Sequence, residues 1–369
     1  MAKILYVITR LAVGGAPHVM LTAIKGLKKA GYEITLASGY PGEGEGSLVD
    51  EAQALGVELI FVPTLQREIH PIRDFRAFFD LWRLMRVGQF DLVHTHLSKA
   101  GILGRLASYL AGIRVVHTFH GDVLDGYFSP LKSKVFLMVE RFVGRMTDRF
   151  ICVSDRLKTR LLQYNLGPAG RFCTVANGID LERLQVKNDA KHNGKCVGTL
   201  AMFYPIKRLD LFVEMAHRLK KRDAEIHCKI AGDGATALAL KQQSKELDDP
   251  VNFVGVCAEP ADFLSRIDVF VLCSDYESSG MSVMEAMGMG VPVVATAVGG
   301  VPENVQDGQT GLLVEAGDVN GLTEAVWALL QDDDKRVQMG ALAKQYAQEH
   351  FLSSRMIADL DRVYRGLLS

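Results

Sequence analysis

Two glutamates, Glu277 and Glu285, stand eight positions apart around a short polar turn, Ser278-Ser279-Gly280, which leads into an apolar stretch expected to be helical. The first N–H groups of a helix lack intrahelical partners, and with the helix dipole they form a site for an anion such as a diphosphate. Glu277 can meet a group beside the diphosphate, and Glu285, one turn inside the helix, can accept hydrogen bonds from hydroxyls on its other side. A diphosphate between two polyhydroxylated groups is a nucleotide sugar, so the stretch predicts a nucleotide-sugar site. The alternative is a solvated helix face.

Two adjacent cations, Lys207 and Arg208, follow the strand-like run that contains Gly198. Cations at the start of a helix interact unfavourably with its dipole unless an anion lies nearby. The pair therefore favours diphosphate binding, and a solvated helix start is the alternative.

Four histidines lie on or beside two strand-like runs, His94 and His96 on the first and His117 and His120 on the second. Alternate residues of a strand share a face, so His94 and His96 are expected to lie together. No carboxylate or cysteine flanks them at ligand spacing, so no metal is expected. His120, at a strand end, is interpreted as a hydrogen-bonding partner of a ligand, and His94 as a core residue.

A glycine pair, Gly14 and Gly15, follows the first strand-like run and precedes a helix. It can form a tight strand–helix turn and also allow close backbone approach to a phosphate or sugar. No Gly-x-Gly-x-x-Gly pattern follows that run, so a dinucleotide fingerprint is absent.

Short apolar, β-branched runs must position these residues, and they alternate with amphipathic helical stretches along the whole chain. The predicted strands are Ile4–Ile8, Glu33–Leu36, Leu59–Val62, Leu92–Thr95, Val115–Thr118, Phe150–Val153, Val197–Leu200, Ile226–Ala231, Phe253–Gly255, Val269–Cys273 and Val291–Ala295. Continuously apolar strands separated by helices predict parallel sheets covered on both faces, an α/β fold class.

The length of 369 residues favours two domains. The polar stretch Gln185–Lys195 breaks the pattern and is the expected linker. Residues 1–185 and 186–345 are then two doubly wound domains, and 346–369 is a terminal helix that crosses back to the first. Ligands of such sheets sit beyond the carboxyl ends of the strands, so a site in the cleft between the domains is expected.

Composition narrows the class of protein. An apolar fraction of 48% and a charged fraction of 23% are typical of soluble globular proteins, and no nucleic-acid partner is expected. The six cysteines form no Cys-x-x-Cys pair and several lie in apolar strand-like runs, so buried free thiols in a reducing compartment are predicted. The apolar run at the N-terminus is too short for a secretory signal, and no segment is long enough to span a bilayer. A cytoplasmic location is therefore expected.

Residues 1–185 carry 23 Lys and Arg against 17 Asp and Glu, a net charge of +6, whereas residues 186–369 carry 19 against 26, a net charge of −7. Two basic amphipathic stretches contribute to this excess: Arg73, Arg76, Arg83 and Arg86, and then Lys132, Lys134, Arg141 and Arg145. Such helices normally pack their apolar face on a sheet. Their basic faces could rest on the anionic head groups of a membrane, and an ordinary solvated face is the alternative.

These residues resemble glycosyltransferase family 4. The Glu277–Glu285 stretch, with its continuation to Glu303, resembles the Glu-x7-Glu region of that family, and the likeness covers nearly the whole chain. It includes Gly14-Gly15-Ala16, His94-Thr95-His96, His117-Thr118-Phe119-His120-Gly121, Asn177-Gly178-Ile179-Asp180, Gly232-Asp233-Gly234 and Asp307-Gly308-Gln309-Thr310-Gly311. The subgroup is similar to bacterial enzymes that build lipopolysaccharide, capsule or exopolysaccharide.

The resemblance implies a GT-B architecture, with two Rossmann-like domains for acceptor and nucleotide sugar. It also implies a retaining transfer without a metal, from a UDP- or GDP-linked sugar to a saccharide or lipid-linked saccharide. By position, the roles it implies are Glu277 and His120 at the transferred sugar, Glu285 at the ribose, Lys207 and the amides near Gly280, Met281 and Ser282 at the diphosphate, and Gly15 near the β-phosphate.

The chain departs from the family pattern in three places. Thr199 stands where the family often has Arg, and Arg208, where glycine is usual, is predicted to supply that charge. Ser278-Ser279-Gly280 replaces Gly-Phe-Gly and bears on sugar selection, and Asp122 and Asp125 replace histidines and bear on the acceptor. A sugar-nucleotide epimerase, a phosphorylase and a non-catalytic nucleotide-sugar-binding paralogue remain alternative functions.

Overall fold

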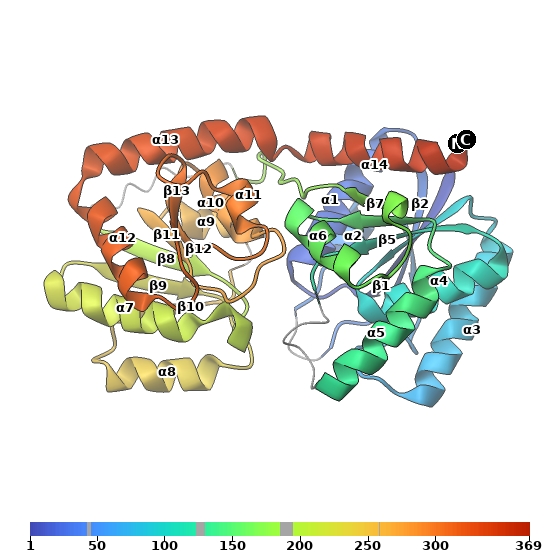
Figure 1. Ribbon diagram of the computed structural model, residues 1–369, viewed down its shortest axis with the longest axis horizontal. Coiled ribbons are helices and arrows are strands. Elements are labelled where there is room, and N and C mark those ends of the chain that lie inside the picture. Colours follow the sequence, from blue (N-terminus) through green and yellow to red (C-terminus); the bar gives the residue numbers. More distant parts are fainter. Residues whose placement is uncertain (43–45, 123–129, 185–194, 258) are drawn as a thin grey trace. The chain divides into compact units, whose positions relative to one another are not determined.

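A computed structural model describes the whole chain except residues 43–45, 123–129, 185–194 and 258 (Figure 1). The described residues form two compact units. Unit 1 comprises Met1–Gly178 and Ser353–Ser369, and unit 2 comprises Ile179–Leu352.

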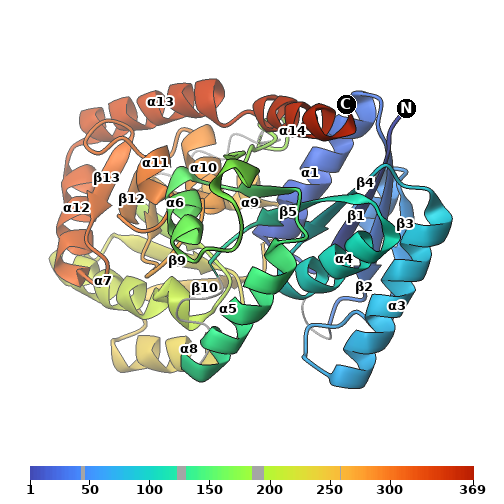
Figure 2. The same cartoon turned by 45° about the vertical axis from the view of Figure 1, so that its right-hand side comes forward.

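Unit 1 contains a seven-stranded parallel sheet in the order β3-β2-β1-β4-β5-β6-β7. Its strands are β1 (Lys3–Arg10), β2 (Glu33–Gly39), β3 (Glu58–Phe61), β4 (Leu92–His96), β5 (Arg114–Phe119), β6 (Arg149–Cys152) and β7 (Phe172–Thr174). Its helices are α1 (Gly15–Lys29), α2 (Val49–Ala54), α3 (Pro71–Gly88), α4 (Ser98–Ala111), α5 (Pro130–Gly144), α6 (Asp155–Gln163), the 3-10 turn η1 (Ala169–Arg171) and α14 (Ser353–Leu368). The strands are buried because helices cover both faces: α3 and α4 pack on one, and α1 and α14 lie side by side on the other (Figures 1 and 2).

The last helix, α14, is fastened to unit 1 by close packing and by hydrogen bonds. A side chain on Gly26 of α1 would collide with Ile357 of α14, since a Cβ there would lie 2.1 Å from Ile357 Cδ1. Tyr32 donates to Asp361 over 2.6 Å, and Arg355 donates to the carbonyl of Asn177 over 2.9 Å. The end of the chain therefore completes the fold of its beginning.

Unit 2 contains a six-stranded parallel sheet in the order β10-β9-β8-β11-β12-β13. Its strands are β8 (Cys196–Leu200), β9 (His227–Ala231), β10 (Val251–Gly255), β11 (Val269–Leu272), β12 (Val293–Thr296) and β13 (Gly311–Val314). Its helices are the 3-10 turn η2 (Pro205–Lys207), α7 (Leu209–Arg222), α8 (Ala237–Glu246), α9 (Pro260–Leu264), α10 (Met281–Gly288), α11 (Val301–Asn304), α12 (Val319–Gln331) and α13 (Asp333–His350).

The α/β fold class with two doubly wound parallel sheets is confirmed, and every predicted strand is present. The two strands that the pattern did not predict, β7 and β13, are short and lie at sheet edges, where little apolar surface is needed. The units divide after Gly178 and after Leu352, compared with expected boundaries at 185/186 and 345/346. The predicted linker falls almost wholly on residues 185–194, outside the described residues.

All six cysteines are described, and within the described parts of the chain each is a free thiol, as predicted. Four of them are buried, whereas Cys173 and Cys257 are half-buried. In those same parts, no helix combines the length and the apolar character that crossing a bilayer requires.

Candidate active site

The residues predicted to carry the chemistry fall into two groups, each within one unit. Gly15 and His120 belong to unit 1. The members in unit 2 are Lys207, Arg208, Glu277, Gly280, Met281, Ser282 and Glu285.

Lys207 and Glu277 form an ion pair at the carboxyl end of the unit 2 sheet. Lys207 ends the turn after β8, Glu277 lies in the loop after β11, and Lys207 Nζ is 2.5 Å from Glu277 Oε1. The Ser274 hydroxyl donates to the same carboxylate oxygen over 2.8 Å. The side chains are 24% and 12% exposed, so the pair is partly screened from solvent and still reachable by a ligand.

The backbone of the Glu277 loop is held by the glycine pair that precedes α11. Gly300 N donates to the Glu277 carbonyl over 2.9 Å. Gly299 has a φ of +49°, and a Cβ there would lie 1.7 Å from that carbonyl oxygen, so a side chain at this position would push the loop away. Thr296 Oγ1 donates to the Ser274 carbonyl over 2.7 Å, which ties the loop to β12.

Helix α10 begins beside this loop, as the sequence predicts. Its N-cap, Gly280, is left-handed with a φ of 69° and provides no capping side chain. The amides of the first turn therefore have no intrahelical acceptors. Met281, Ser282 and Glu285 are half-buried on this helix, and spacings of three and four residues place Glu285 on the face of the other two.

Arg208 is engaged by two carboxylates. Its backbone is left-handed, with a φ of 47°, and its guanidinium lies 3.0 Å from Asp210 Oδ2 and 3.2 Å from Asp275 Oδ1. Hydrogen bonding to Asp210 raises the pKa of Arg208 above its ordinary value. Its charge is thus largely matched within unit 2, and its predicted contact with a diphosphate stays a prediction. Thr199 is buried in β8.

In unit 1 the histidines at the ends of β4 and β5 form a connected cluster. His96 Nδ1 is 2.9 Å from His120 Nε2. The buried His94 bonds through Nε2 to Thr118 Oγ1 at 2.7 Å and through Nδ1 to the Tyr364 hydroxyl at 2.5 Å. The interpretation of His94 as a satisfied core residue is confirmed.

Burial keeps these imidazoles neutral. Desolvation lowers the pKa of His94 to about 3 and that of His120 to about 4, and it lowers the pKa of His96 and His117 well below the ordinary range. At neutral pH each ring carries one proton, so each can donate through one nitrogen and accept through the other.

The remaining predicted positions of unit 1 are Gly15, which follows the first strand, and Asp122 and Asp125, which come shortly after His120 in the sequence. Gly15 is exposed at the first position of α1, where the helix amides lack intrahelical acceptors. Asp122 is buried, contacts Arg160 and accepts from the Tyr164 hydroxyl over 2.8 Å. Asp125 lies outside the described residues.

Sequence reasoning missed three contributors to these clusters: Ser274, Gly299 and Tyr364. A single serine gives no sequence signal, and Gly299 stood only inside the longer resembling stretch. Tyr364 lies 270 positions from its partner His94. Across the described ranges no group of three or more His, Cys, Asp or Glu side chains is arranged to hold a metal ion.

Family models match both units. The model described as Glycosyltransferase Family 4 matches residues 13–183, and the model described as Glycosyl transferases group 1 matches residues 194–332.

Among characterised relatives, the chain is 28% identical to the UDP-Gal:alpha-D-GlcNAc-diphosphoundecaprenol alpha-1,3-galactosyltransferase of Escherichia coli, over 89% of this chain and 88% of that protein. It is 30% identical to the N-acetyl-alpha-D-glucosaminyl L-malate synthase of Bacillus anthracis, over 75% of each chain.

Among solved structures, HepE of Anabaena in complex with UDP and glucose matches with a TM-score of 0.87 and 20% identity, over 99% of this chain and all of that one. A sucrose-phosphate synthase from Thermosynechococcus elongatus matches with a TM-score of 0.85 and 20% identity, over all of this chain and 99% of that one. With the two doubly wound sheets, these neighbours confirm the GT-B fold class.

Proposed function

The chain belongs to glycosyltransferase family 4, and we propose that it is a retaining enzyme that moves a sugar from a UDP- or GDP-linked donor to an acceptor hydroxyl. The acceptor is a saccharide or lipid-linked saccharide of a bacterial cell-surface polysaccharide or lipopolysaccharide.

The observation that carries the proposal is the Lys207–Glu277 ion pair beside the start of α10. A dissociating nucleotide sugar places two negative phosphates next to a sugar that develops positive charge. The Lys207 ammonium and the α10 amides match the phosphates, and the Glu277 carboxylate matches the sugar. Glu285, one turn further along α10, is assigned to the ribose hydroxyls.

Names of the relatives support the choice of substrates. The E. coli relative is named for UDP-Gal as donor and for a diphosphoundecaprenol-linked acceptor, and the Anabaena structure contains UDP and glucose. We extend a nucleoside-diphosphate sugar and a lipid-linked saccharide to this chain on that basis.

In the proposed mechanism the bond between the anomeric carbon and the β-phosphate oxygen breaks, and the acceptor oxygen bonds to that carbon on the same face. Configuration is retained because the new bond forms on the face that the phosphate leaves. The departing phosphate takes the acceptor proton, and no carboxylate becomes a nucleophile. This differs from glycoside hydrolysis by two carboxylates. Positioning and electrostatic stabilisation of the leaving diphosphate supply most of the rate.

Incubation of the protein with labelled UDP- and GDP-sugars and a diphosphopolyprenol-linked N-acetylhexosamine tests this function. We expect nucleoside diphosphate release that requires the acceptor, and a product whose anomeric configuration, determined by NMR, equals that of the donor. An inverted product would refute the retaining mechanism. Formation of a sugar phosphate when inorganic phosphate is supplied would indicate a phosphorylase. Conversion of the donor into a different nucleotide sugar would indicate an epimerase. Binding of the nucleotide sugar without any turnover would indicate a sensor.

Two helices of unit 1 also support a membrane partner, because they expose apolar side chains at helical spacing. The exposed set on and just before α3 is Ile69, Ile72, Phe75 and Phe79, and the set on α5 is Leu131, Val135, Met138 and Phe142. We call these eight residues the apolar stripes. The sequence-based expectation that such helices pack their apolar face on the sheet is therefore only partly right, since Ala77, Leu81 and Met85 are buried there.

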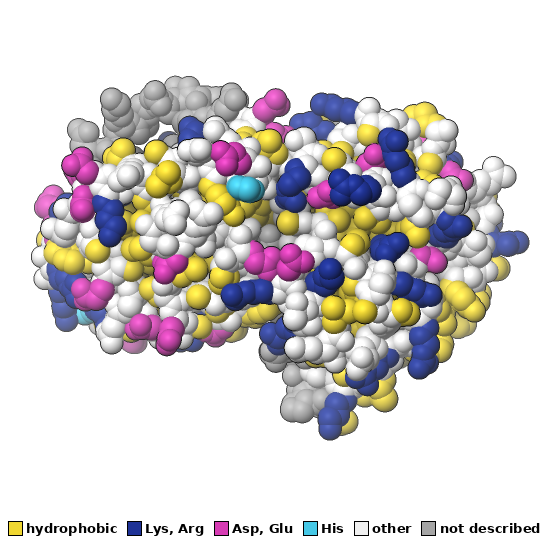
Figure 3. Space-filling model, turned by 45° about the horizontal axis from the view of Figure 1, so that its top comes forward, with side chains coloured by type: hydrophobic (Ala, Val, Ile, Leu, Met, Phe, Trp, Pro, Cys, Tyr) yellow, Lys and Arg dark blue, Asp and Glu magenta, His cyan; other side chains and the backbone are white. Residues whose placement is uncertain are grey.

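Exposed basic residues accompany the stripes: Arg76, Arg83, Arg86, Lys132, Lys134, Arg141 and Arg145. On the face of unit 1 that Figure 3 shows, basic side chains lie among apolar ones. Arg73 does not join this basic set, because it is half-buried and donates to Gln66.

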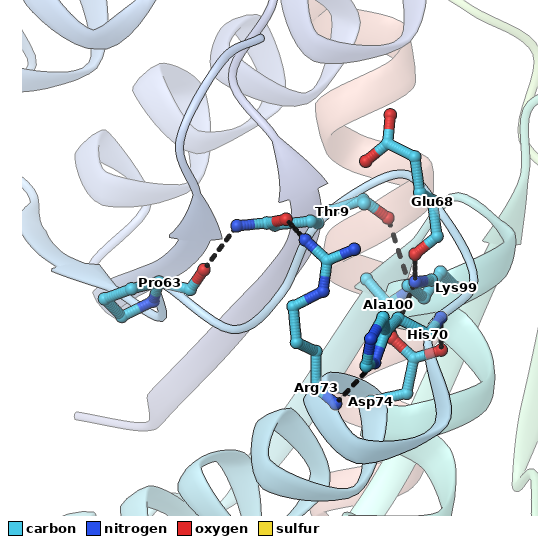
Figure 4. Close-up of polar contacts among 9 residues, drawn as sticks. Thr9, Pro63, Glu68, His70, Arg73, Asp74, Lys99 and Ala100 are labelled. Carbon is cyan, nitrogen blue, oxygen red and sulfur yellow. Dashed lines mark hydrogen bonds and ion pairs between the residues drawn. The ribbon is translucent and has the colours of Figure 1, made fainter.

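A polar network holds the start of α3 in place (Figure 4). His70 Nδ1 accepts from the backbone N–H of Arg73 and so caps the helix. The backbone N–H of His70 donates to Asp74 Oδ2 over 3.0 Å. Lys99 of α4 donates to Asp74 Oδ1 over 2.6 Å and also contacts the Glu68 carbonyl. Ile69 and Ile72 are thus presented by a fixed turn.

We propose that the apolar stripes and their basic neighbours bind the anionic cytoplasmic face of a membrane, where a lipid-linked acceptor would be found. Each Lys or Arg near such a surface contributes about 1 kcal/mol, screened by salt, and inserted apolar side chains add a part that salt does not screen. Binding should be reversible.

Vesicle sedimentation tests this partner. We expect more protein to sediment with anionic than with neutral vesicles, and less at high salt. Leu131→Ser with Met138→Ser should weaken the binding, whereas Leu238→Ser, at an 86% exposed position of unit 2, should not. Equal recovery from both lipids, or indifference to the α5 substitutions, would show an ordinary solvated face.

A further inference from the structure

His96 is the last residue of β4, and its ring is held among other rings in the interior of unit 1. It stacks on Tyr6, with ring centroids 5.4 Å apart and planes 15° apart, and it lies 4.2 Å from the ring of His94. Its side chain is buried, and it lines a small pocket together with His120 and Asn177. The ring therefore has one orientation, and so has the nitrogen that it directs at His120.

The contact between His96 Nδ1 and His120 Nε2 contains one proton. Both rings are neutral at physiological pH, so each has a single N–H, and the 2.9 Å separation is that of an ordinary hydrogen bond. Either His96 donates from Nδ1, which places the His120 proton on Nδ1, or His120 donates from Nε2, which places the His96 proton on Nε2.

The other nitrogen of His96 distinguishes these arrangements. His96 Nε2 is buried and has no hydrogen-bond partner among the described residues. If His120 were the donor, the proton on this nitrogen would be a buried N–H without an acceptor. If His96 is the donor, Nε2 is instead an unprotonated acceptor without a partner. Buried acceptors that lack a donor are more common in proteins than buried N–H donors that lack an acceptor. The geometry favours donation by His96.

We infer that His96 is a positioning residue that donates from Nδ1 to His120 Nε2 and so fixes the His120 proton on Nδ1, where it faces the ligand as a hydrogen-bond donor. The inference rests on the proposed function in that His120 contacts the transferred sugar or its leaving group. A donor at Nδ1 can bond a sugar hydroxyl or a phosphate oxygen, whereas a bare Nδ1 could bond only the hydroxyl. The alignment of β4 with β5, which pairs His96 with Thr118, sets the distance between the two rings.

Histidine-specific 15N labelling and long-range 1H–15N NMR of the intact protein test the tautomer directly, with His120 signals assigned by loss in His120→Gln. We expect the Nδ1–H form in the wild type and in His96→Asn, whose side-chain amide keeps an N–H near the position of Nδ1. His96→Leu should shift His120 towards the Nε2–H form, and His117→Asn, a buried histidine without a bond to His120, should not.

Turnover provides the second arm. His96→Leu should lower kcat about tenfold, equivalent to ~1.4 kcal/mol, with little change in affinity for the free nucleoside diphosphate, and His96→Asn should recover most of that loss. A wild-type His120 in the Nε2–H form, or equal loss in the Leu and Asn variants, would overturn the inference. The NMR arm needs no substrate, so failure of the proposed function would appear as absent transfer with an unchanged His120 tautomer.

Discussion

In unit 1, His94, His96 and Tyr364 are buried and join neutral groups by hydrogen bonds, whereas in unit 2 Lys207 and Glu277 are charged and partly exposed. The first cluster lies under α1 and α14, and the second lies on loops after strands β8 and β11. Desolvation lowers the pKa of the unit 1 histidines, and direct pairing neutralises charge in unit 2.

The difference matches the chemistry proposed for each side. A diphosphate carries charge that partly exposed cations and helix amides can meet. A neutral sugar is oriented by fixed donors and acceptors, and buried rings keep their geometry because their neighbours leave them no other rotamer. Each prediction below tests one side of this contrast.

The largest expected effect is on stability at acid pH. The folded-state pKa of His94 is lowered to about 3 and that of His120 to about 4, below the unfolded value of about 6.5. Below pH ~6.5 the unfolded state therefore binds more protons, and unit 1 should lose up to about 1.4 kcal/mol per pH unit for each such histidine until the folded pKa is reached. That stability is fully present above pH ~6.5.

Each unit has its own tryptophan, Trp82 in α3 and Trp327 in α12, so Trp327→Phe and Trp82→Phe variants report the two units separately. Urea unfolding between pH 7.5 and 4.5 should show a steep fall in the free energy of unfolding of unit 1, followed through the fluorescence of Trp82. The fall in the free energy of unfolding of unit 2, followed through Trp327, should be smaller, because the described part of unit 2 has no fully buried histidine. Equal shifts of the two transitions would remove the contrast.

Breaking the ion pair should have the next largest effect. Lys207→Met should weaken binding of the free nucleoside diphosphate by roughly 2–3 kcal/mol, because a charged hydrogen bond is lost and Glu277 stays without its cation. Glu277→Gln should lower kcat far more than it lowers that binding. Calorimetry and steady-state kinetics on both variants check this division.

Because the two side chains touch, the variant that carries both Lys207→Met and Glu277→Gln should lose less free energy than the sum of the two single losses. The difference, the coupling energy, should be about 0.5–3 kcal/mol. Additive losses would mean that the pair does not act as a unit.

On the neutral side, Tyr364→Phe removes a hydroxyl shared by Tyr6 and His94, each 2.5 Å away. Two buried groups then lack a partner, so the free energy of unfolding of unit 1 should fall by about 1–3 kcal/mol. Denaturant unfolding followed through Trp82 measures it. Tyr346→Phe, at a partly buried tyrosine of unit 2, is the matched control and should change little. A neutral effect of Tyr364→Phe would show that the network adds no stability.

The smallest expected effect is none: transferase activity should persist in EDTA. Lys207 and the α10 amides are assigned the diphosphate charge that a divalent cation would otherwise meet. Loss of activity with the chelator, restored by magnesium or manganese, would contradict this assignment.

The sequence by itself determined the α/β class, the alternation of strands and helices, and the turn before α10. These depend on local signals: apolar runs such as Val269–Cys273 must be buried wherever they lie, and Gly280 favours the left-handed cap between Glu277 and the helix. The sequence pattern did not predict the edge strands β7 and β13, because these short strands bury few apolar side chains.

Only the tertiary structure decided which partners the functional side chains have. His96 meets His120 because β4 and β5 pair in parallel with a set register, although the two residues are 24 positions apart. Tyr364 reaches His94 because α14 packs on α1, and Lys207 reaches Glu277 because β8 pairs with β11. A hydrogen bond or ion pair depends on separations of a few ångströms. Strand pairing and helix packing set those separations, and the local sequence around one residue does not show which distant residue becomes its partner.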